Sequence, residues 1–280
     1  MRTETSRLLL ECVENCVEKA GSDLNDITIE KVTLGLFFTG VKLSSGQAGL
    51  CFTPVKDMPQ AVCCPSSANA MPYAGKMSGK PVWQFIEYVL DDNPLKRAIG
   101  IATLNAVSDY VRTCGGDDFK GGTILTYGDA FDDIKIGEKT KAIVVGALVP
   151  VMKKLKEAEA DWTVLELDPR TLKEDELSHY MPYEKAPEVI PDADLLIITG
   201  VTILNDTLSD ILELASPDAE ILVTGPTVSM LPDPLFEHGV TVIGGVKVTD
   251  PDKALKLIAE GGSGYHLFGS CAERTIERLK

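Results

Sequence analysis

Apolar residues at helical spacing open the chain, and this pattern stops at Gly21. Residues three or four apart lie on one face of a helix, so the segment predicts an amphipathic helix with Cys12 and Cys16 on its buried side. Residues 27–43 change to an alternating period, and a second apolar run follows a Ser-Gly turn. This alternation predicts a small antiparallel sheet after the first helix.

The next segment, residues 57–80, is rich in Pro, Ser, Ala and Gly and predicts a long surface loop. Helical patterning returns at Pro81. Asn93-Pro94 then predicts the start of another helix, and the small residues along that helix favour close packing.

From about residue 120, short apolar runs alternate with helical patterns. The predicted strands are 123–127, 142–147, 162–167, 195–199, 220–224 and 240–246, with helices beginning at Pro150, near Asp206, near Pro232 and at Asp250-Pro251. Near-continuous apolar strands between helices are typical of a parallel sheet covered on both faces. We therefore predict an α/β protein, in which a small α+β domain (residues 1–92) precedes a Rossmann-like, doubly wound, mainly parallel domain (residues 93–280).

Composition narrows the classes of partner. The chain has 280 residues and a formal net charge of −15, which disfavours nucleic acid and acidic membranes as partners. No apolar run approaches the roughly 20 residues of a membrane span, and the first 16 residues lack the apolar core of a signal peptide. Seven scattered cysteines predict reduced thiols. We expect a cytoplasmic protein with a small-molecule or metal ligand; a homo-oligomer is left open.

Two strands end in the same chemistry, Thr-Gly-x-Thr. Ligands of doubly wound sheets gather at the carboxyl ends of the strands, so two such ends side by side predict a polar crevice rim. The residues concerned are Thr199, Gly200, Thr202, Thr224, Gly225 and Thr227. The alternative is ordinary, because glycine turns and hydroxyl caps often join strands to helices.

Asn205 and Asp206 follow the first of these ends. We expect one of the two to cap the helix that carries Leu208 and Ile211. The free N–H groups of that helix would also attract an anionic group of a ligand.

Gly146 and Glu166 stand 20 residues apart, which is the spacing between the first turn and the ribose-binding acid of dinucleotide folds. The segment after Gly146 lacks the other glycines of that motif, so ordinary NAD binding is not favoured. Glu166 and Asp168 are either polar ligands in the crevice or solvated loop acids.

The pattern of metal ligands is poor. His179, His238 and His266 are isolated, and no Cys-x-x-Cys pair is present. Cys12 and Cys16 are expected to pack in the core. Cys63-Cys64, and the aspartates of residues 128–133, remain candidate cation contacts, with a solvated acidic turn as the alternative for the latter.

Several long motifs resemble one family. They are GVKLSSGQAGLCFTP, GIATLNAVS, DADLLIITGVTILNDTL, TGPTVSMLPDPLFEHGV and GGVKVTDPDKALKLIAEGG, in this order. In this set the chain is similar to prokaryotic proteins of unknown function described as "putative heavy-metal chelation" proteins. The resemblance implies a first domain like the N-terminal domain of enolase, a Rossmann-like second domain, and a site in the cleft between them.

Carried over by motif, the resemblance also implies a set of ligand-binding residues. They are Lys42, Ser45, Gly46, Asn105, Glu166, Thr199, Gly200, Thr202, Asn205, Gly225, Pro226, Thr227 and Asp250. One departure stands out, because Ala147-Leu148 replaces the His-Phe that relatives carry after Gly146. A metal ligand or catalyst at that histidine would be missing here.

Three hypotheses follow. The first is a metal-handling protein that holds a transition-metal ion, or a small chelator of one, in the interdomain cleft. The second is an enzyme that uses a nucleotide-like or adenosyl cofactor at the Rossmann crevice. A purely structural role is the third, and the two matching polar strand ends argue against it.

Overall fold

The computed structural model describes residues 3–57, 71, 73–114, 123–132, 134–137 and 140–279. Most of the loop predicted at 57–80, including Cys63-Cys64, and Asp133 of the acidic cluster lie outside the described residues. No described helix is both long and apolar enough to cross a membrane.

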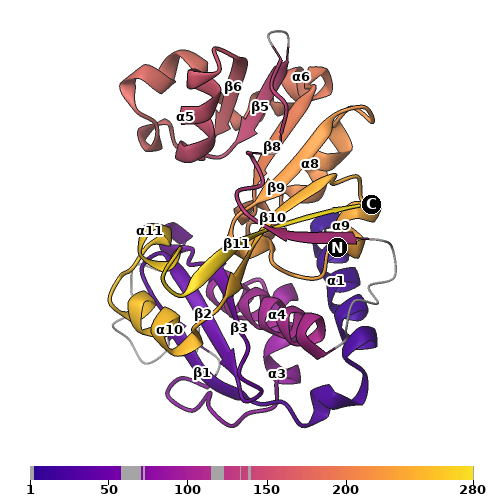
Figure 1. Cartoon of the computed structure of the whole chain (residues 1–280), viewed down its shortest axis with the longest axis vertical. Helices are drawn as coiled ribbons and strands as arrows, with labels where there is room; N and C mark the ends of the chain where they lie inside the picture. The colour runs from indigo at the N-terminus through magenta and orange to yellow at the C-terminus, as the bar shows by residue number, and fades with distance from the viewer. Residues whose placement is uncertain are drawn as a thin grey trace.

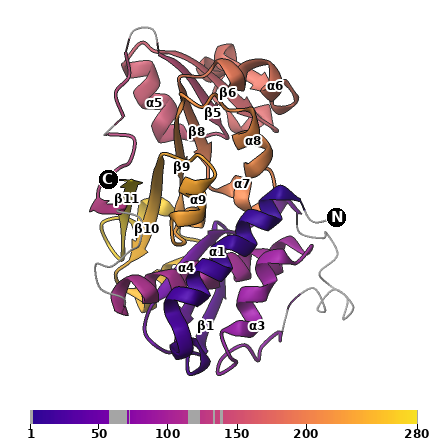
Figure 2. The same ribbon diagram turned by 90° about the vertical axis from the view of Figure 1, so that its right-hand side faces the viewer.

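Helix α1 (Glu4–Ala20) matches the first prediction. The side chain of Thr3 caps its start by accepting a hydrogen bond from the Ser6 N–H (3.1 Å), and Gly21 (φ 61°) follows its last residue. Cys12 and Cys16 lie on its buried face, as expected. Figure 2 shows α1 running across the first half of the chain toward α9, which belongs to the second half.

The predicted antiparallel sheet is confirmed as β1 (Ile29–Leu34), β2 (Phe38–Leu43) and β3 (Ala48–Phe52), paired in that order. Helix α4 (Pro94–Cys114) packs on one face so closely that a Cβ added at Gly49 would lie 2.2 Å from the Ala102 carbonyl oxygen. Helix α10 (Pro251–Ala259), from the far end of the chain, covers the other face (Figure 1). The small sheet is thus enclosed by both halves of the chain.

Helix α4 begins as predicted. The Asn93 side chain accepts hydrogen bonds from the N–H groups of Leu95 (3.0 Å) and Lys96 (3.1 Å). The short helix α3 (Trp83–Ile86) precedes it. Because α4 lies past residue 93 and packs on β2 and β3, the boundary between residues 92 and 93 stays a prediction. The resemblance of this part to the N-terminal domain of enolase also stays a prediction.

The second sheet has eight described strands in the order β4-β11-β10-β9-β8-β5-β6-β7. Their bounds are β4 (Thr123–Tyr127), β5 (Lys141–Val145), β6 (Asp161–Glu166), β7 (Tyr180–Pro182), β8 (Leu195–Thr199), β9 (Glu220–Thr224), β10 (Val242–Val248) and β11 (Ala272–Leu279). The strands from β10 to β7 are parallel, whereas β11 is antiparallel to both of its neighbours. The six parallel strands follow the Rossmann order, which confirms the predicted fold class.

Helices cover both faces of this sheet. On one face, Met152 and Leu155 of α5 (Val149–Glu157) join the core cluster that contains Val144. On the other face, Leu208 of α8 (Leu208–Leu214) joins a cluster that also contains Leu104 of α4. The other short α-helices among the described residues are α6 (Ala186–Val189), α7 (Val201–Leu204), α9 (Asp233–Glu237) and α11 (Gly264–Leu267). One core therefore joins the small sheet's helix to the Rossmann-like sheet.

The expectation that Asn205 or Asp206 caps α8 is wrong. Thr207 is the N-cap residue, and its side chain makes no capping bond. Asn205 instead closes α7, and Asp206 (φ 69°) turns its carboxylate toward Arg97, whose guanidinium donates to it at 3.0 Å. The Asp206 carboxylate thus pairs with Arg97 of α4 and does not accept from the first N–H groups of α8.

Candidate functional site

Two pockets lie on opposite faces of the sheet where β10, β11 and β4 meet. Successive side chains of a strand point to opposite faces of its sheet. The neighbouring residues Val246 and Lys247 of β10 therefore lie on opposite faces. We call the first the α4 pocket; it has a volume of about 260 Å³ and lies between α4 and the sheet. The second, the α5 pocket, has about 240 Å³ and lies beside the start of α5.

The α4 pocket is lined by helix residues and by three strands. Its lining consists of Asn105, Asp109, Arg112, Thr113, Leu125, Tyr127, Ser229, Val246, Lys247, Thr275 and Glu277. Side chains from the first and the second half of the chain therefore meet in it. It is the described pocket that agrees best with the cleft that the resemblance implies.

Asn105 joins three segments behind this pocket. Its Nδ2 donates to the carbonyl oxygens of Leu50 (2.7 Å), Thr227 (3.0 Å) and Pro226 (3.2 Å), which fixes the orientation of the amide. The opposite atom, Oδ1, is buried and has no hydrogen-bond partner among the described residues. A buried acceptor left unpaired costs about 1–3 kcal/mol, so this atom is an energetic cost of the fold.

Asp109 lies one helical turn after Asn105, at the spacing that places two side chains on one helix face. Burial raises the pKa of its carboxyl above the ordinary value, while the positive charges of Lys247 and Arg112 oppose that shift. Asp109 and Lys247 both line the pocket. Within the described part of the chain, neither forms an ion pair with the other or with any third group.

Arg112 and Glu277 form the rigid wall of the pocket. Arg112 donates to Glu277 Oε1 (2.6 Å) and to the carbonyl oxygens of Ser229 (2.9 Å) and Met230 (2.8 Å). Burial raises the pKa of the Glu277 carboxyl, and Arg112 opposes the rise. Both charges are thus matched inside the protein, in contrast to those of Asp109 and Lys247.

The two matching strand ends do lie side by side, because β8 and β9 are parallel neighbours with Thr199 opposite Thr224. Their polar atoms, however, are bonded within the protein. Thr202 Oγ1 donates to the Thr199 carbonyl oxygen (2.8 Å), and Thr227 Oγ1 accepts from the Phe52 N–H (3.0 Å).

The glycines of these ends behave in the same way. The Gly200 N–H donates to Thr224 O (2.7 Å), and the Gly225 N–H donates to Gly244 O (2.9 Å). Of the predicted strand-end residues, Thr224 and Gly225 line the α5 pocket, together with the neighbouring Pro226. The other four, Thr199, Gly200, Thr202 and Thr227, line neither pocket.

Glu166 closes the turn after β5. Its Oε2 accepts from the Ala147 N–H (2.9 Å), and its Oε1 accepts from the N–H groups of Leu167 (2.8 Å) and Asp168 (3.2 Å). The Leu148 N–H also bonds locally, to Gly146 O. The backbone donors that would hold a pyrophosphate in a dinucleotide fold are therefore occupied.

Asp168 lies in the same region and binds two cations of the chain. Its carboxylate pairs with Arg170 (2.8 Å) and with Lys56 (2.9 Å), which hold its pKa well below the usual range.

The remaining predicted residues lie outside both pockets. Lys42 pairs with Glu30 (2.8 Å) and Asp252 (2.9 Å), and Asp250 caps α10 by accepting from the Lys253 N–H (3.1 Å). The other three are exposed: Ser45 and Gly46 in the turn between β2 and β3, and Asn205 after α7. The structure does not bring these residues together with Asn105.

Sequence reasoning missed Asp109, Lys247 and Arg112 as lining residues. Helical spacing from Asn105 could have found Asp109, because both lie on one face of α4. Lys247 lies in the motif GGVKVTDPDKALKLIAEGG, which contributed only to the family resemblance. No sequence pattern pointed to Glu277, because the strand that carries it, β11, was not predicted.

A closed protein site for a bare metal ion has no support in the described residues. No three His, Cys, Asp or Glu side chains gather there in a way that could hold an ion. Burial raises the pKa of Cys16 to about 11 and that of Cys51 to about 12, so these thiols are protonated at neutral pH and are poor ligands.

Comparison with known sequences decides the family. The sequence model of a family described as "Putative heavy-metal chelation" matches residues 129–277, and a second model with the same description matches residues 17–108. The chain belongs to the family that carries this description. The resemblance inferred from the motifs is thereby confirmed.

Relatives of known sequence or structure agree. An uncharacterized protein of Methanocaldococcus jannaschii is 31% identical over 199 residues, which are 71% of this chain and 72% of that protein. The crystal structure of a protein of unknown function from the same family, from Pyrococcus horikoshii, is similar with a TM-score of 0.74 and 24% identity, over 96% of this chain and 98% of that one. A third, from Desulfitobacterium hafniense, has a TM-score of 0.67 and 21% identity, over 96% and 98%. The two structures show the same fold.

Proposed function

We propose that this protein binds a small amino-carboxylate chelator, or the metal complex of such a chelator, in the α4 pocket. The carrying observation is that Asp109 and Lys247 line one pocket with opposite charges that do not pair. The family description supports a role in metal handling.

The charges of the pocket match a dipolar ligand. A ligand amine can donate to Asp109, and a ligand carboxylate can accept from Lys247. Hydrogen bonds with a charged partner are stronger than neutral ones. A ligand that bonds to both Asp109 and Lys247 therefore makes two such bonds. A ligand with only one of these groups leaves the other protein charge unmatched.

The same contacts remain available when the chelator carries a metal. A metal-bound amine keeps N–H donors, and a metal-bound carboxylate keeps an outer oxygen acceptor. The protein would then recognise the organic shell, and the metal would be cargo whose ligands come from the chelator. This reading agrees with the lack of a three-ligand cluster among the described side chains.

The size of the pocket also limits the ligand. Pockets for drug-sized molecules have about 300–1,000 Å³. At about 260 Å³, the α4 pocket fits a ligand of amino-acid size, and a full dinucleotide would not enter it. A nucleotide-like cofactor at the Rossmann crevice has no support either, since Glu166 accepts from the Ala147 N–H and Gly146 O accepts from the Leu148 N–H after β5.

Thermal unfolding in the presence of probes tests this proposal. We expect histidine and its one-to-one nickel complex to raise the melting temperature of the full chain, because a ligand that binds only the folded state stabilises it. Nickel chloride alone and propionate should have little effect. Stabilisation by bare nickel that equals the effect of the complex would overturn the proposal, as would no response to any dipolar probe at 10 mM, a concentration on the order of that needed for very weak binding.

A further inference from the structure

We infer that the α5 pocket is a second binding site, for a small organic monoanion with an apolar body, such as an aryl or branched-chain carboxylate. It lies on the face of the sheet opposite the α4 pocket. Val246 and Thr275 border both pockets, so only the sheet separates them. The inference does not depend on the function proposed for the α4 pocket.

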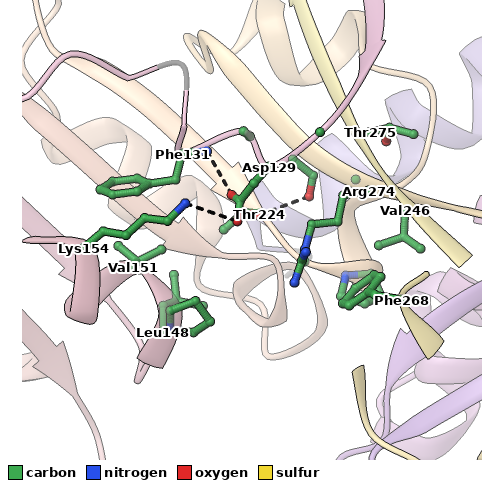
Figure 3. Close-up of a pocket in the computed structure, with 17 residues that line it drawn as sticks. Asp129, Phe131, Leu148, Val151, Lys154, Thr224, Val246, Phe268, Arg274 and Thr275 are labelled. Carbon is green, nitrogen blue, oxygen red and sulfur yellow. Dashed lines mark hydrogen bonds and ion pairs between the residues drawn. The ribbon is translucent and has the colours of Figure 1, made fainter. Parts of the chain in front are cut away.

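The walls of the α5 pocket are apolar. Leu148 and Val151 come from the start of α5, Phe131 from the segment after β4, and Val246 from β10. Figure 3 shows these side chains around a common space at the strand ends. Burial of an apolar ligand body against such walls contributes about 25 cal/mol for each Å² removed from water.

Gly244 of β10 leaves space in the α5 pocket because it has no side chain. A Cβ added at Gly244 would lie 2.5 Å from Thr224 Oγ1 and 3.0 Å from the Ala130 Cβ. A side chain at this position of β10 would therefore collide with the floor and fill the space above it. The pocket volume of about 240 Å³ depends on this small residue and suits a compact ligand.

Arg274 supplies the positive charge. Its guanidinium lies over the ring of Phe268, 4.2 Å from the ring centroid, which restricts where the charge can go. No carboxylate in the described ranges forms an ion pair with it. A planar guanidinium with free donors matches a carboxylate in two parallel hydrogen bonds.

Lys154 also lines the α5 pocket, but unlike Arg274 it forms ion pairs within the protein. Its ammonium pairs with Asp129 (3.5 Å) and more closely with Asp132, so its charge is already neutralised by the protein. In Figure 3, Lys154 points toward Asp129, whereas Arg274 enters the pocket from β11. Asp129 and Asp132 together carry one negative charge more than Lys154 neutralises, and Arg274 is the cation without an ion pair among the described lining residues. This balance favours a ligand with a single negative charge over a phosphate or a dicarboxylate.

Titration calorimetry of the full chain with phenylacetate and with its neutral amide, phenylacetamide, tests the inference. We expect phenylacetate to bind at least about tenfold more tightly than the amide, as the loss of one charge-assisted hydrogen-bonded contact implies. Arg274→Met should reduce phenylacetate affinity by about the same factor and leave that of the amide unchanged. Equal affinity for the two probes, no heat from phenylacetate at 10 mM (roughly the limit of weak specific binding), or an unaffected Arg274→Met variant would overturn the inference.

Three control variants separate the site from general effects. Arg7→Met removes an exposed arginine that pairs with Glu4 in α1 and should leave binding intact. Asp109→Asn changes only the α4 pocket and should also leave phenylacetate binding intact. Val151→Trp fills the α5 pocket without changing its charge and should abolish binding while the melting temperature shows that the variant folds; retained binding in this variant would place the ligand elsewhere and contradict the inference.

Discussion

The Nδ2 atom of Asn105 donates a 3.0 Å hydrogen bond to the carbonyl oxygen of Thr227 and so joins α4 to the turn after β9. The same amide group also reaches Leu50 in β3 and Pro226 in that turn. One buried side chain thus fixes the relative position of the small sheet, its helix and the Rossmann-like sheet. The walls of the α4 pocket depend on that position.

Removing this amide should destabilise the protein. We expect Asn105→Ala to lower the free energy of unfolding by about 2–4 kcal/mol, because buried carbonyl oxygens lose their donor at about 1–3 kcal/mol each and part of the loss is recovered by relaxation or water. Urea unfolding measures the effect. Asn205→Ala is the matched control, since Asn205 is exposed and should change stability by less than about 0.5 kcal/mol. Equal effects of the two substitutions would contradict the structural role of Asn105.

The contact between β3 and α4 predicts a steric effect. A Cβ at Gly49 would lie 2.2 Å from the Ala102 carbonyl oxygen and 2.3 Å from the Ala106 nitrogen, both backbone atoms. Gly49→Ala should therefore destabilise the chain by roughly 1–3 kcal/mol or more, through forced separation of the helix from the sheet. At Gly137 the nearest atom to an added Cβ is 3.5 Å away, so Gly137→Ala serves as the control and should be nearly neutral. Chemical denaturation of the two variants compares them directly.

Asp109 predicts a dependence of stability on pH. Because burial raises the pKa of its carboxyl above the ordinary 3.8, the folded chain holds this proton over a pH range in which the unfolded chain has lost it. The contribution of the group to stability is full below pH 3.8 and declines as the pH rises through the folded-state pKa. Asp109→Asn should therefore be more stable than the parent near pH 7 and lose this advantage toward pH 3.5–4.0, an interval set roughly by the ordinary carboxyl pKa.

Unfolding curves from pH 3 to pH 8, a range chosen to span roughly the ordinary and the raised carboxyl values, measure this difference. Asp92→Asn is the control, because Asp92 is exposed and forms no ion pair with another described residue. An advantage of Asp109→Asn that grows toward low pH would contradict the predicted sign.

Local sequence patterns predicted the elements better than the site. The apolar run at 195–199 and the run at 220–224 coincide with β8 and β9, because a strand buried on both faces needs apolar residues at every position. Strand β11 was missed, since polar Glu273, Arg274 and Glu277 interrupt its apolar residues. Its partners, β10 and β4, come from earlier in the chain, and such long-range pairing leaves no local signal.

The site depended on the same long-range contacts. The hydroxyls of Thr202 and Thr227 looked free at their strand ends, but distant or backbone groups occupy them. Conversely, Asp109 and Lys247 are 138 positions apart, and their common role is visible only once the fold places both in the lining of one pocket. A sequence pattern can show that a polar residue is available, whereas the fold determines which polar residues remain unpaired.

The central claim is that Asp109 and Lys247 together recognise a dipolar chelator. Titration calorimetry with the one-to-one nickel–histidine complex should give binding for the parent chain, and a loss of about tenfold or more for Asp109→Asn and for Lys247→Met, since each removes one charge-assisted contact. Asp92→Asn and Lys256→Met, at exposed positions, should bind as the parent does. Binding that is unchanged in both pocket variants, or equally reduced in the exposed controls, would contradict the claim.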